Sequence, residues 1–507
     1  YFDSIPNLHI TGQVNTYEQI GYVKSTKDSR QIGFQETDIV SIASPITKTS
    51  MQLKKANDIV KVLDHLYEVS QSGRQGPVLL DLPMNFQRVE VKKFKNKKNS
   101  LIKQNHNYNK KNLDKKIIDI IKLLISSNKP VILSGGGVRY SKCVKKLNKL
   151  IDYLKIPVVS SWSGIDTLDY NNKYYIGHVG VYGSRSGNFS IQNSDLLISI
   201  GSRLDTRITG GRPDTFARNA KIIMVDIDKG ELSKRRGLTP SIEVNIDAEK
   251  FINIFYDQLT RSNYKKSNIQ NIWLKKCLNW KKIYPTVSKE FGKSNKFVNP
   301  YLFVENLSKC LDENDVIIPD DGAHLTWFMQ AYKVKLGQRV FSAYGNSPMG
   351  YSFPASIGAS IALNKKRVIC IDGDGSFQIN IQELQTVVNE KLPIKIFILN
   401  NEYMGMVRQW QELLHEKNYS ESYTAALPDF VKLAESYGCV GIRAKTPDEL
   451  DGKIKEMIDV QKPVIFDCVV DKSENCFPMI PSGKPHNQMI LGPEEEEEIS
   501  DEGKILV

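Results

Sequence analysis

The sequence predicts an α/β protein made of three doubly wound parallel-sheet domains, and three observations carry this prediction. The chain has 507 residues, enough for about three domains at roughly 150 residues each. Short apolar segments alternate with helical patterns along most of its length, which is typical of βαβ units. Several of these segments are continuously apolar, as expected for parallel strands that are buried on both faces of a sheet.

The first predicted domain covers residues 1–90, with strands at 8–11 and 77–82 and a helix at 57–70. Residues 91–116 follow with ten lysines and few apolar side chains, so this stretch is predicted to be a linker that cannot pack a core. The chain starts with Tyr1 rather than methionine, and it starts inside what reads as a domain. We therefore expect an N-terminal segment of the protein to precede it.

The second predicted domain covers residues 117–255, and its strands are expected at 131–133, 157–160, 196–200, 222–226 and 242–244. Residues 256–300 are polar with a helical pattern that places Trp273 and Trp280 on one face, so they are predicted to form a helical connector. The third domain is expected at 301–480, with strands at 316–318, 368–372, 394–399, 440–444 and 464–469. The tail, 481–507, contains five consecutive glutamates and is predicted not to pack.

Composition excludes several classes of protein. No segment approaches the ~20 consecutive apolar residues of a membrane helix, so no membrane partner is expected. The seven cysteines are scattered without a CxxC pair, which argues against a disulfide scaffold or a zinc site and favours the cytoplasm. The net charge of +12 raises the question of nucleic acid, but the lysines gather in one polar stretch, as on a solvated surface. Nucleic acid is therefore not an expected partner.

The strongest chemical signal lies between residues 368 and 401. A predicted strand runs into Gly373-Asp374-Gly375-Ser376, and the next strand ends in Asn400-Asn401. A right-handed crossover makes such strands parallel, so Asp374 and Asn401 would both lie at carboxyl ends, where open α/β sheets bind ligands. Carboxylate and amide oxygens suit Mg²⁺, and glycines before a helix suit a diphosphate. The alternative is a glycine turn without a ligand.

The GDG motif followed by NN at this spacing resembles the cofactor motif of thiamine diphosphate-dependent enzymes. The resemblance implies that Asp374, Asn401 and the backbone carbonyl of Tyr403 hold Mg²⁺. It further implies that four residues contact the thiamine diphosphate: Gly373, Gly375, Ser376 and Asn400.

Other segments narrow the resemblance to the acetohydroxyacid (acetolactate) synthase family. They are ITGQV at 10–14, FQET at 34–37, SGRQGPVLLDLP at 72–83, EYMGMVRQWQ at 402–411 and PMIPSG at 478–483. The resemblance covers nearly the whole chain. It implies the C-terminal part of a pyrimidine-binding domain, a central Rossmann-like FAD-binding domain and a diphosphate-binding domain, in that order.

The resemblance also assigns residues to the reaction. Met349 looks like the bulky side chain that bends the cofactor, and Met406 and Trp410 belong to the matching helix, where the tryptophan favours 2-ketobutyrate as second substrate. Phe34 and Gln35 match residues that reach the active site of a neighbouring subunit. Core packing is the alternative for Met349 and Trp410.

A second set of residues would bind FAD. GVYG at 180–183 resembles the family's GMHG, with Tyr182 in place of histidine. GSRLDTR at 201–207 resembles G-x-R-F-D-D-R, but Leu204 replaces the phenylalanine and Thr206 replaces the second aspartate. An arginine guanidinium can donate two hydrogen bonds to one phosphate, and a carboxylate at a strand end can accept hydrogen bonds from a ribose. Ordinary turns in a vestigial domain are the alternative, as is a role for Arg207 in holding a substrate carboxylate. Residues 135–137, three glycines, are a weaker signal. The FAD contacts implied are Gly180, Gly183, Gly201, Arg203, Arg207, Asp226 and Asp247.

The resemblance implies an acetolactate synthase of branched-chain amino acid (isoleucine and valine) biosynthesis. It would decarboxylate pyruvate on thiamine diphosphate and transfer the hydroxyethyl unit to a second 2-ketoacid. The family's quaternary structure implies a homodimer or tetramer, with a small regulatory subunit as a further partner. The glutamate that activates the cofactor in this family is absent from the sequence, so this chain alone is expected to be inactive. The alternatives are a carboligase that transfers an acetyl unit to a keto-sugar nucleotide, favoured by Asn346-Ser347-Pro348 and GSRLDTR, and a non-catalytic homologue.

Overall fold

The computed structural model describes residues 1–91, 108–234, 236–288, 291, 296–486 and 488–492. It falls into two compact units, residues 1–108 with 344–346 and residues 109–343 with 347–507. Three sheets are present in the described residues, one in the first unit and two in the second, and all of their strand pairs are parallel. The predicted α/β class with three parallel sheets is confirmed. Among the described helices, none combines the length and apolarity needed to cross a membrane.

The first unit contains a three-stranded sheet in the order β1-β3-β2. Its predicted strands and helix are found within a few residues, whereas β2 was not predicted because its sequence, TSMQ, is mostly polar and only half-buried. Leu66 of helix α2 packs with Val78 and Leu80 of β3 to form the centre of the core. The elements are β1 (Leu8–Gln13), α1 (Ile39–Ala43), β2 (Thr49–Gln52), α2 (Ile59–Gln71), β3 (Val78–Pro83) and α3 (Met84–Gln87).

The linker prediction for residues 91–116 is wrong at its C-terminal end. Helix α4 (Lys110–Ser126) begins there, and Asn109 caps it by accepting a hydrogen bond from the backbone N–H of Asn112. The lysines lie between apolar residues at helical spacing, which bury one stripe of the helix: Leu113, Ile117, Ile120, Ile121 and Leu124. The rest of the predicted linker, 92–107, lies outside the described residues.

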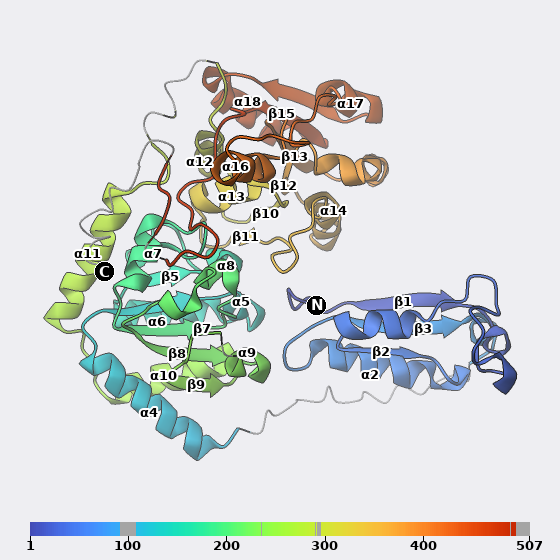
Figure 1. Cartoon of the computed structure of the whole chain (residues 1–507), viewed down its shortest axis with the longest axis horizontal. Helices are drawn as coiled ribbons and strands as arrows, with labels where there is room; N and C mark the ends of the chain where they lie inside the picture. The colour runs from blue at the N-terminus through green and yellow to red at the C-terminus, as the bar shows by residue number, and fades with distance from the viewer. Residues whose placement is uncertain (92–107, 235, 289–290, 292–295, 487, 493–507) are drawn as a thin grey trace. The chain divides into compact units, whose positions relative to one another are not determined.

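The central sheet has six strands in the order β6-β5-β4-β7-β8-β9, with helices along it (Figure 1). Five strands were predicted, and the sixth, β6, was not, because glycine and histidine interrupt its apolar pattern. The strands are β4 (Pro130–Ser134), β5 (Val158–Ser160), β6 (Tyr175–His178), β7 (Leu196–Ile200), β8 (Lys221–Asp226) and β9 (Ile242–Asn245). The helices are α5 (Gly137–Tyr140), α6 (Val144–Leu154), η5 (Trp162–Thr167), α7 (Arg185–Gln192), α8 (Thr206–Thr209), α9 (Lys229–Ser233) and α10 (Ala248–Arg261).

The predicted helical connector contributes to the core of the central domain. Helix α11 (Asn268–Ile283) buries Trp273 and Trp280, whose rings meet edge to face with centroids 5.6 Å apart. The Trp273 indole donates a hydrogen bond to the carbonyl of Pro130 at the start of β4. The polar side chains on which the connector prediction was based lie on the solvent side of this amphipathic helix.

The third sheet also has six strands, in the order β11-β10-β12-β13-β15-β14 (Figure 1). Only β11, two residues long, was not predicted. The strands are β10 (Val316–Pro319), β11 (Arg339–Val340), β12 (Val368–Gly373), β13 (Ile394–Asn400), β14 (Val440–Ala444) and β15 (Val464–Val469). The helices are α12 (Pro300–Cys310), α13 (Ala323–Ala331), α14 (Ser352–Ala362), η8 (Phe377–Glu383), α15 (Leu384–Asn389), α16 (Gly405–Leu414), α17 (Phe430–Tyr437) and α18 (Pro447–Asp459).

Two details of the third domain differ from the prediction. The helix expected after the GDGS glycines is a 3₁₀ segment, η8, followed by the short α15, because Asn380 leaves helical geometry and its side-chain amide donates to the carbonyl of Gly350 at 2.6 Å. The first part of the tail is packed, since Met479 pairs with Ile490 and His486 is buried. The glutamate run of the tail lies outside the described residues.

His486 gives the fold a pH dependence that can be measured. Burial lowers its pKa to about 4, and Nε2 lies 2.8 Å from the carbonyl oxygen of Ile208. The unfolded chain binds a proton here below about pH 6.5, so stability falls as the pH drops from 6.5 towards 4. We expect the wild type to lose about 2 kcal/mol more than His486→Gln between pH 7 and 5, measured by urea unfolding. Equal losses in both proteins would contradict this assignment.

Candidate active site

The carboxyl ends of β12 and β13 bring Asp374 and Asn401 to one edge of the third sheet. The two strands pair in parallel, with Gly373 opposite Leu399, and both polar residues are buried just beyond them. The Asp374 carboxylate accepts a hydrogen bond from the backbone N–H of Glu402 at 2.6 Å. Burial raises the pKa of Asp374 to about 6, and hydrogen bonds from backbone N–H groups oppose that rise. The βαβ argument thus placed these residues correctly, while their role as metal ligands stays a prediction.

The neighbouring residues are fixed by local hydrogen bonds. The backbone N–H of Tyr403 points at the side-chain oxygen of Asn401 at 3.3 Å. The Asn400 amide donates to Asp467 at 3.0 Å, and its own oxygen is buried without a hydrogen-bond partner. A buried oxygen without a hydrogen-bond partner destabilises the folded protein. A hydrogen-bond donor on a bound ligand would pair with this oxygen and remove that cost.

The GDGS loop forms a cradle that is tight on one side and open on the other. A Cβ atom on Gly373 would lie 2.8 Å from the His324 ring, whereas one on Gly375 would meet only the methyl group of Met349, at 3.9 Å. The Ser376 hydroxyl is turned inward, where it donates to Asp372. Only glycine fits at 373, and the backbone at 375 has the open space that a diphosphate needs.

His324 is a site residue that the sequence reasoning did not identify. It is buried at the start of α13, and its Nε2 has no hydrogen-bond partner. Burial lowers the pKa of His324 to about 3, so its ring is neutral at pH 7. The free Nε2 atom can then donate or accept one hydrogen bond, depending on the tautomer. An open cradle, a buried carboxylate and an unpaired imidazole nitrogen together fit a bound diphosphate with its metal ion.

Two buried carboxyl groups, Asp320 and Asp372, lie beside this cradle. They too were not identified from the sequence. Asp320 accepts hydrogen bonds from the backbone N–H groups of Gly350 and Ser352, each at 2.7 Å. Asp372 accepts from the Ser352 hydroxyl at 2.8 Å. Burial and the charge of Asp320 raise the pKa of Asp372 to about 8. Asp320, Asp372 and His324 together have the composition of a metal site. The oxygens of both carboxylates, however, already accept these hydrogen bonds. Their effect is to fix the loop that carries Met349.

Helix α16 lies on the other side of the open cradle. A Cβ atom on Gly405 would lie 2.8 Å from the side chain of Ala323, so this helix sits closely against α13. The Met406 sulfur lies 3.8 Å from the Cys476 sulfur. Trp410, one turn further along the helix, is 44% exposed. A methionine and a tryptophan at this spacing form one apolar face.

The GVYG loop and the PMIPSG segment meet, although they are far apart in the sequence. The backbone N–H of Ile480 donates to the carbonyl of Val181 at 2.9 Å, and Val181 in turn donates to the carbonyl of Arg207 at 2.8 Å. The Arg207 guanidinium lies 4.6 Å from the centre of the Trp162 ring. Burial raises the pKa of Asp321, and the positive charge of Arg207 opposes this rise. Arg207 therefore reaches towards the domain that holds Asp374.

The residues predicted to bind FAD lie at the carboxyl edge of the central sheet. The backbones of Gly135 and Gly201 pack so closely that a Cβ on Gly135 would lie 2.1 Å from the carbonyl oxygen of Gly201. Burial raises the pKa of Asp226 to about 6. The nearby Ser202 hydroxyl is buried without a partner. Glycines at strand ends, an acid and an unpaired hydroxyl together fit a dinucleotide.

Other members of the predicted FAD set are used within the protein. Asp247 caps α10 by accepting from the backbone N–H of Glu249 at 2.8 Å and also accepts from the Ser141 hydroxyl. Arg203 lies 3.1 Å from Asp205. A Cβ on Gly180 would clash with the Arg207 carbonyl at 2.4 Å, and one on Gly183 with the Gly180 nitrogen at 2.6 Å. These two glycines shape the loop around Tyr182.

Phe34 and Gln35 lie in the first unit. Phe34 is 85% exposed, and Gln35 has a left-handed backbone with φ of 71°. Within the described residues of this unit neither side chain is part of the core. Their contribution to a neighbouring subunit stays a prediction.

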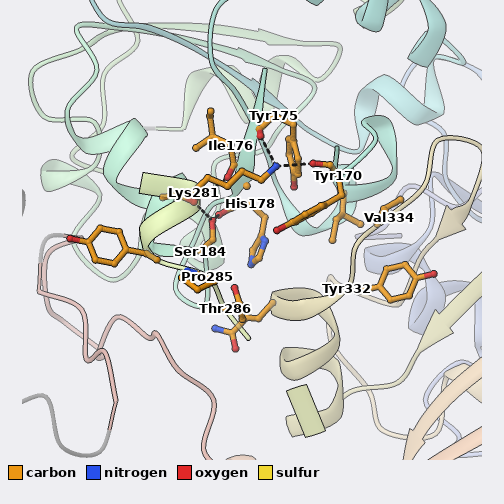
Figure 2. A pocket seen from close by; sticks show the side chains of 15 residues that line it. Tyr170, Tyr175, Ile176, His178, Ser184, Lys281, Pro285, Thr286, Tyr332 and Val334 are labelled. Carbon is orange, nitrogen blue, oxygen red and sulfur yellow. Dashed lines mark hydrogen bonds between the residues drawn. The ribbon is translucent and has the colours of Figure 1, made fainter. Parts of the chain in front are cut away.

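A separate small cavity lies beside β6 and α11 (Figure 2). The Lys281 ammonium donates to the carbonyls of Tyr170 and Tyr175 at 2.7 and 2.9 Å, and burial lowers its pKa to about 8. The cavity measures about 30 Å³, room for about one or two water molecules. It is too small for either cofactor or for a substrate.

Comparison with known proteins agrees with this geometry. Residues 320–468 match the family described as "Thiamine pyrophosphate enzyme, C-terminal TPP binding domain", and residues 117–254 match "Thiamine pyrophosphate enzyme, central domain". The second range contains the whole central sheet, and the first contains β11, β12, β13 and β14 of the third sheet, with all of β15 except Val469.

Relatives in bacteria and algae match the chain over nearly its whole length. The acetolactate synthase large subunit of Cyanidium caldarium is 35% identical over 495 residues, covering 96% of this chain and 81% of the relative. That of Haemophilus influenzae is 32% identical over 501 residues, covering 98% and 84%. That of Lactococcus lactis subsp. lactis is 32% identical over 490 residues, covering 97% and 81%. The chain therefore belongs to the acetolactate synthase large subunit family of thiamine diphosphate-dependent enzymes.

Proposed function

We propose that this chain is the catalytic subunit of an acetolactate synthase, which joins two 2-ketoacids with loss of carbon dioxide. The observation that carries the proposal is the position of Asp374 and Asn401 at adjacent strand ends, beside the open face of Gly375. Mg²⁺ would be held by Asp374, Asn401 and the Tyr403 carbonyl, which are hard oxygen ligands. The diphosphate would lie over Gly375 and His324.

Thiamine diphosphate, when bound, supplies an electron sink that lets pyruvate lose carbon dioxide and its two-carbon unit add to a second 2-ketoacid. The protein's contribution is to position the reactants. Met349 would support the cofactor above the cradle, at a place fixed by Asp320. Arg207 would hold the carboxylate of the second 2-ketoacid, since a guanidinium matches that geometry. Trp410 would contact its alkyl group.

FAD is proposed as a second cofactor at the carboxyl edge of the central sheet. The close backbones of Gly135 and Gly201, the unpaired Ser202 hydroxyl and Asp226 support it. The purified protein is expected to bind flavin, and the retained flavin can be measured by its absorbance and fluorescence. Protein that neither retains nor takes up FAD would overturn this part of the proposal.

Three further parts of the proposal concern domains, assembly and location. We propose the order of pyrimidine-binding, FAD-binding and diphosphate-binding domains, in a homodimer or tetramer with a small regulatory subunit. The exposed Phe34 is suited to a subunit contact, and light scattering would measure the assembly. A cytoplasmic location is supported by the seven cysteines, all of which lie in the described residues and are free thiols.

The function is tested with full-length protein, its segment upstream of Tyr1 restored where the gene encodes one. Pyruvate, thiamine diphosphate, Mg²⁺ and FAD are supplied, and acetolactate is quantified. We expect turnover in the ordinary range of enzymes, about 1–10³ s⁻¹. Decarboxylation without acetolactate would contradict the synthase assignment and favour a keto-sugar acceptor. No reaction with pyruvate would contradict both.

Replacing Trp410 with leucine is expected to lower the preference for 2-ketobutyrate over pyruvate as the second substrate. These acceptors differ by one methylene group, and a pocket contact with one methylene is worth about ten-fold in selectivity. The measurement is the ratio of the two acetohydroxyacids formed from mixed substrates, with Ile272→Ala on the exposed face of α11 as the control. An unchanged ratio would mean that Trp410 only packs.

A further inference from the structure

Asn400, the last residue of β13, has a side-chain amide that is paired at one end only. Its nitrogen donates to the Asp467 carboxylate at 3.0 Å, whereas its oxygen is buried without a hydrogen-bond partner among the described residues. Asn400 follows Leu399, which is opposite Gly373 in the parallel pair of β13 with β12. Since Asp374 directly follows Gly373, Asn400 and this proposed metal ligand are neighbouring positions at the sheet edge.

The Asp467 carboxylate is held in turn by Arg443. Asp467 lies on β15, between β13 and β14 in the sheet, and is 1% exposed. Its second oxygen accepts a hydrogen bond at 2.7 Å from Nε of Arg443, the residue directly opposite on β14. Arg443 also donates at 2.7 Å to Asp429, which caps helix α17. Each oxygen of the Asp467 carboxylate therefore has a partner, and the group cannot turn without breaking an ion pair.

These contacts determine which end of the Asn400 amide is left over. A carboxylate paired with a guanidinium is charged and only accepts hydrogen bonds, so the amide can pair with Asp467 through its nitrogen and not through its oxygen. The remaining oxygen is an acceptor and needs a donor. A diphosphate bound to Mg²⁺ offers acceptor oxygens, whereas the ion itself usually keeps water molecules, which are donors.

We propose that Asp467 is a positioning residue of the cofactor site: it binds the Asn400 amide nitrogen and thereby leaves the Asn400 oxygen to accept a hydrogen bond from water on the bound Mg²⁺. Arg443 keeps the Asp467 carboxylate charged and in place. This inference rests on the proposed acetolactate synthase function and deepens it. Asn400 would then contact the cofactor complex through water, whereas the sequence resemblance implied a direct contact with thiamine diphosphate.

The test is calorimetric titration of the protein with thiamine diphosphate in the presence of Mg²⁺, which measures binding without catalysis. Asp467→Asn keeps the shape of the side chain, but its new amide can donate as well as accept, so the Asn400 amide loses its fixed orientation. We expect the affinity to fall by about 10- to 100-fold, the usual effect of removing a group behind a metal's ligands. In an Asn400→Ala background, the same substitution should change the affinity by less than about two-fold, since residues that act through each other are not additive.

Asp315→Asn is the matched control. Asp315 is also a buried carboxylate, 5% exposed, and it accepts from Arg367 at 2.7 Å within the same domain. The two residues directly precede β10 and β12, at the edge of the sheet opposite the cradle. The control therefore breaks a similar ion pair far from the site, and the affinity should stay within about two-fold of wild type because distant sites act independently.

A second variant separates orientation from stability. Asp467→Asn leaves Arg443 without its buried partner, which destabilises the fold. The double variant Asp467→Asn/Arg443→Gln removes both charges, so that no guanidinium is left unpaired there, and it should show the same loss of affinity. Far-UV circular dichroism verifies that each variant is folded before it is titrated.

The outcomes separate this inference from the function on which it rests. If the wild type does not bind thiamine diphosphate with Mg²⁺, the proposed function fails and the inference fails with it. If the wild type binds and the folded Asp467 variants bind equally well, only the inference fails. An equal loss of affinity with and without the Asn400 amide would show that Asp467 does not act through it, which also overturns the inference. So would a loss for Asp315→Asn as large as that for Asp467→Asn, because it would indicate general disruption.

Discussion

Replacing Asp374 with alanine is expected to weaken the binding of thiamine diphosphate in the presence of Mg²⁺ by at least about 100-fold, since even residues behind a metal's ligands cost 10- to 100-fold. The carboxylate supplies negative charge at a buried sheet edge, where it is oriented by the backbone N–H of Glu402. Alanine leaves two neutral oxygen ligands, too few to hold the ion in a dry site. Isothermal titration calorimetry measures the loss directly, without any dependence on catalysis.

The control for this prediction is Asp459→Ala. Asp459 is an exposed carboxylate at the end of α18 in the same domain, so its loss changes the net charge equally without touching the cradle. Affinity for the cofactor should stay within about two-fold of wild type, since surface substitutions change free energies by less than about 0.5 kcal/mol. Equal affinities of wild type and Asp374→Ala would contradict the assignment of the site.

Replacing Asp166 with alanine is expected to destabilise the second unit by about 3–5 kcal/mol, the usual cost of breaking a buried ion pair. Its side chain is fully buried in η5 and pairs with Arg139 at 3.2 Å and Arg339 at 2.6 Å. It also accepts from the backbone N–H of Val340 at 3.1 Å. Alanine would leave both guanidinium groups without this partner, and it would remove the link between the central domain and β11.

Differential scanning calorimetry measures this loss. At about 2–4 °C per kcal/mol for domains of this size, the melting temperature should fall by about 10 °C. Asp119→Ala is the control, because Asp119 pairs with Lys122 on an exposed face of α4 and exposed pairs contribute about 0–1 kcal/mol. A fall for Asp166→Ala no larger than that for Asp119→Ala would show that the link does not stabilise the fold.

The position of the cofactor cradle could be predicted because it depends on local connectivity. Asp374 and Asn401 follow successive strands of one βαβ unit, and the handedness of that unit leaves one arrangement. His324 and Asp320 could not be predicted in the same way, since neither lies in the GDG…NN segment. The signal that could have found them is that β10 also ends at this edge, followed at once by Asp320.

The errors in the fold prediction also concern features that a local sequence pattern does not specify. Strands β7 and β15, in which every residue but one is apolar, were predicted with their correct bounds, because a buried parallel strand needs apolar residues whatever its neighbours are. Strand β2 and the start of α4 were not predicted, because their polar residues lie at half-buried positions in β2 and at exposed positions in α4. A polar residue does not specify by itself whether it faces solvent or a partner.

The sequence by itself determined the class of fold, most of the strands and the sheet edge at which Asp374 and Asn401 lie. These features follow from local periodicity and from short connections, which one stretch of chain contains completely. The tertiary structure alone decided which distant residues meet: Asp166 with Arg339, 173 positions away, and Val181 with Ile480. Such contacts depend on how separately folded layers pack, and a single sequence carries no local pattern that encodes that packing.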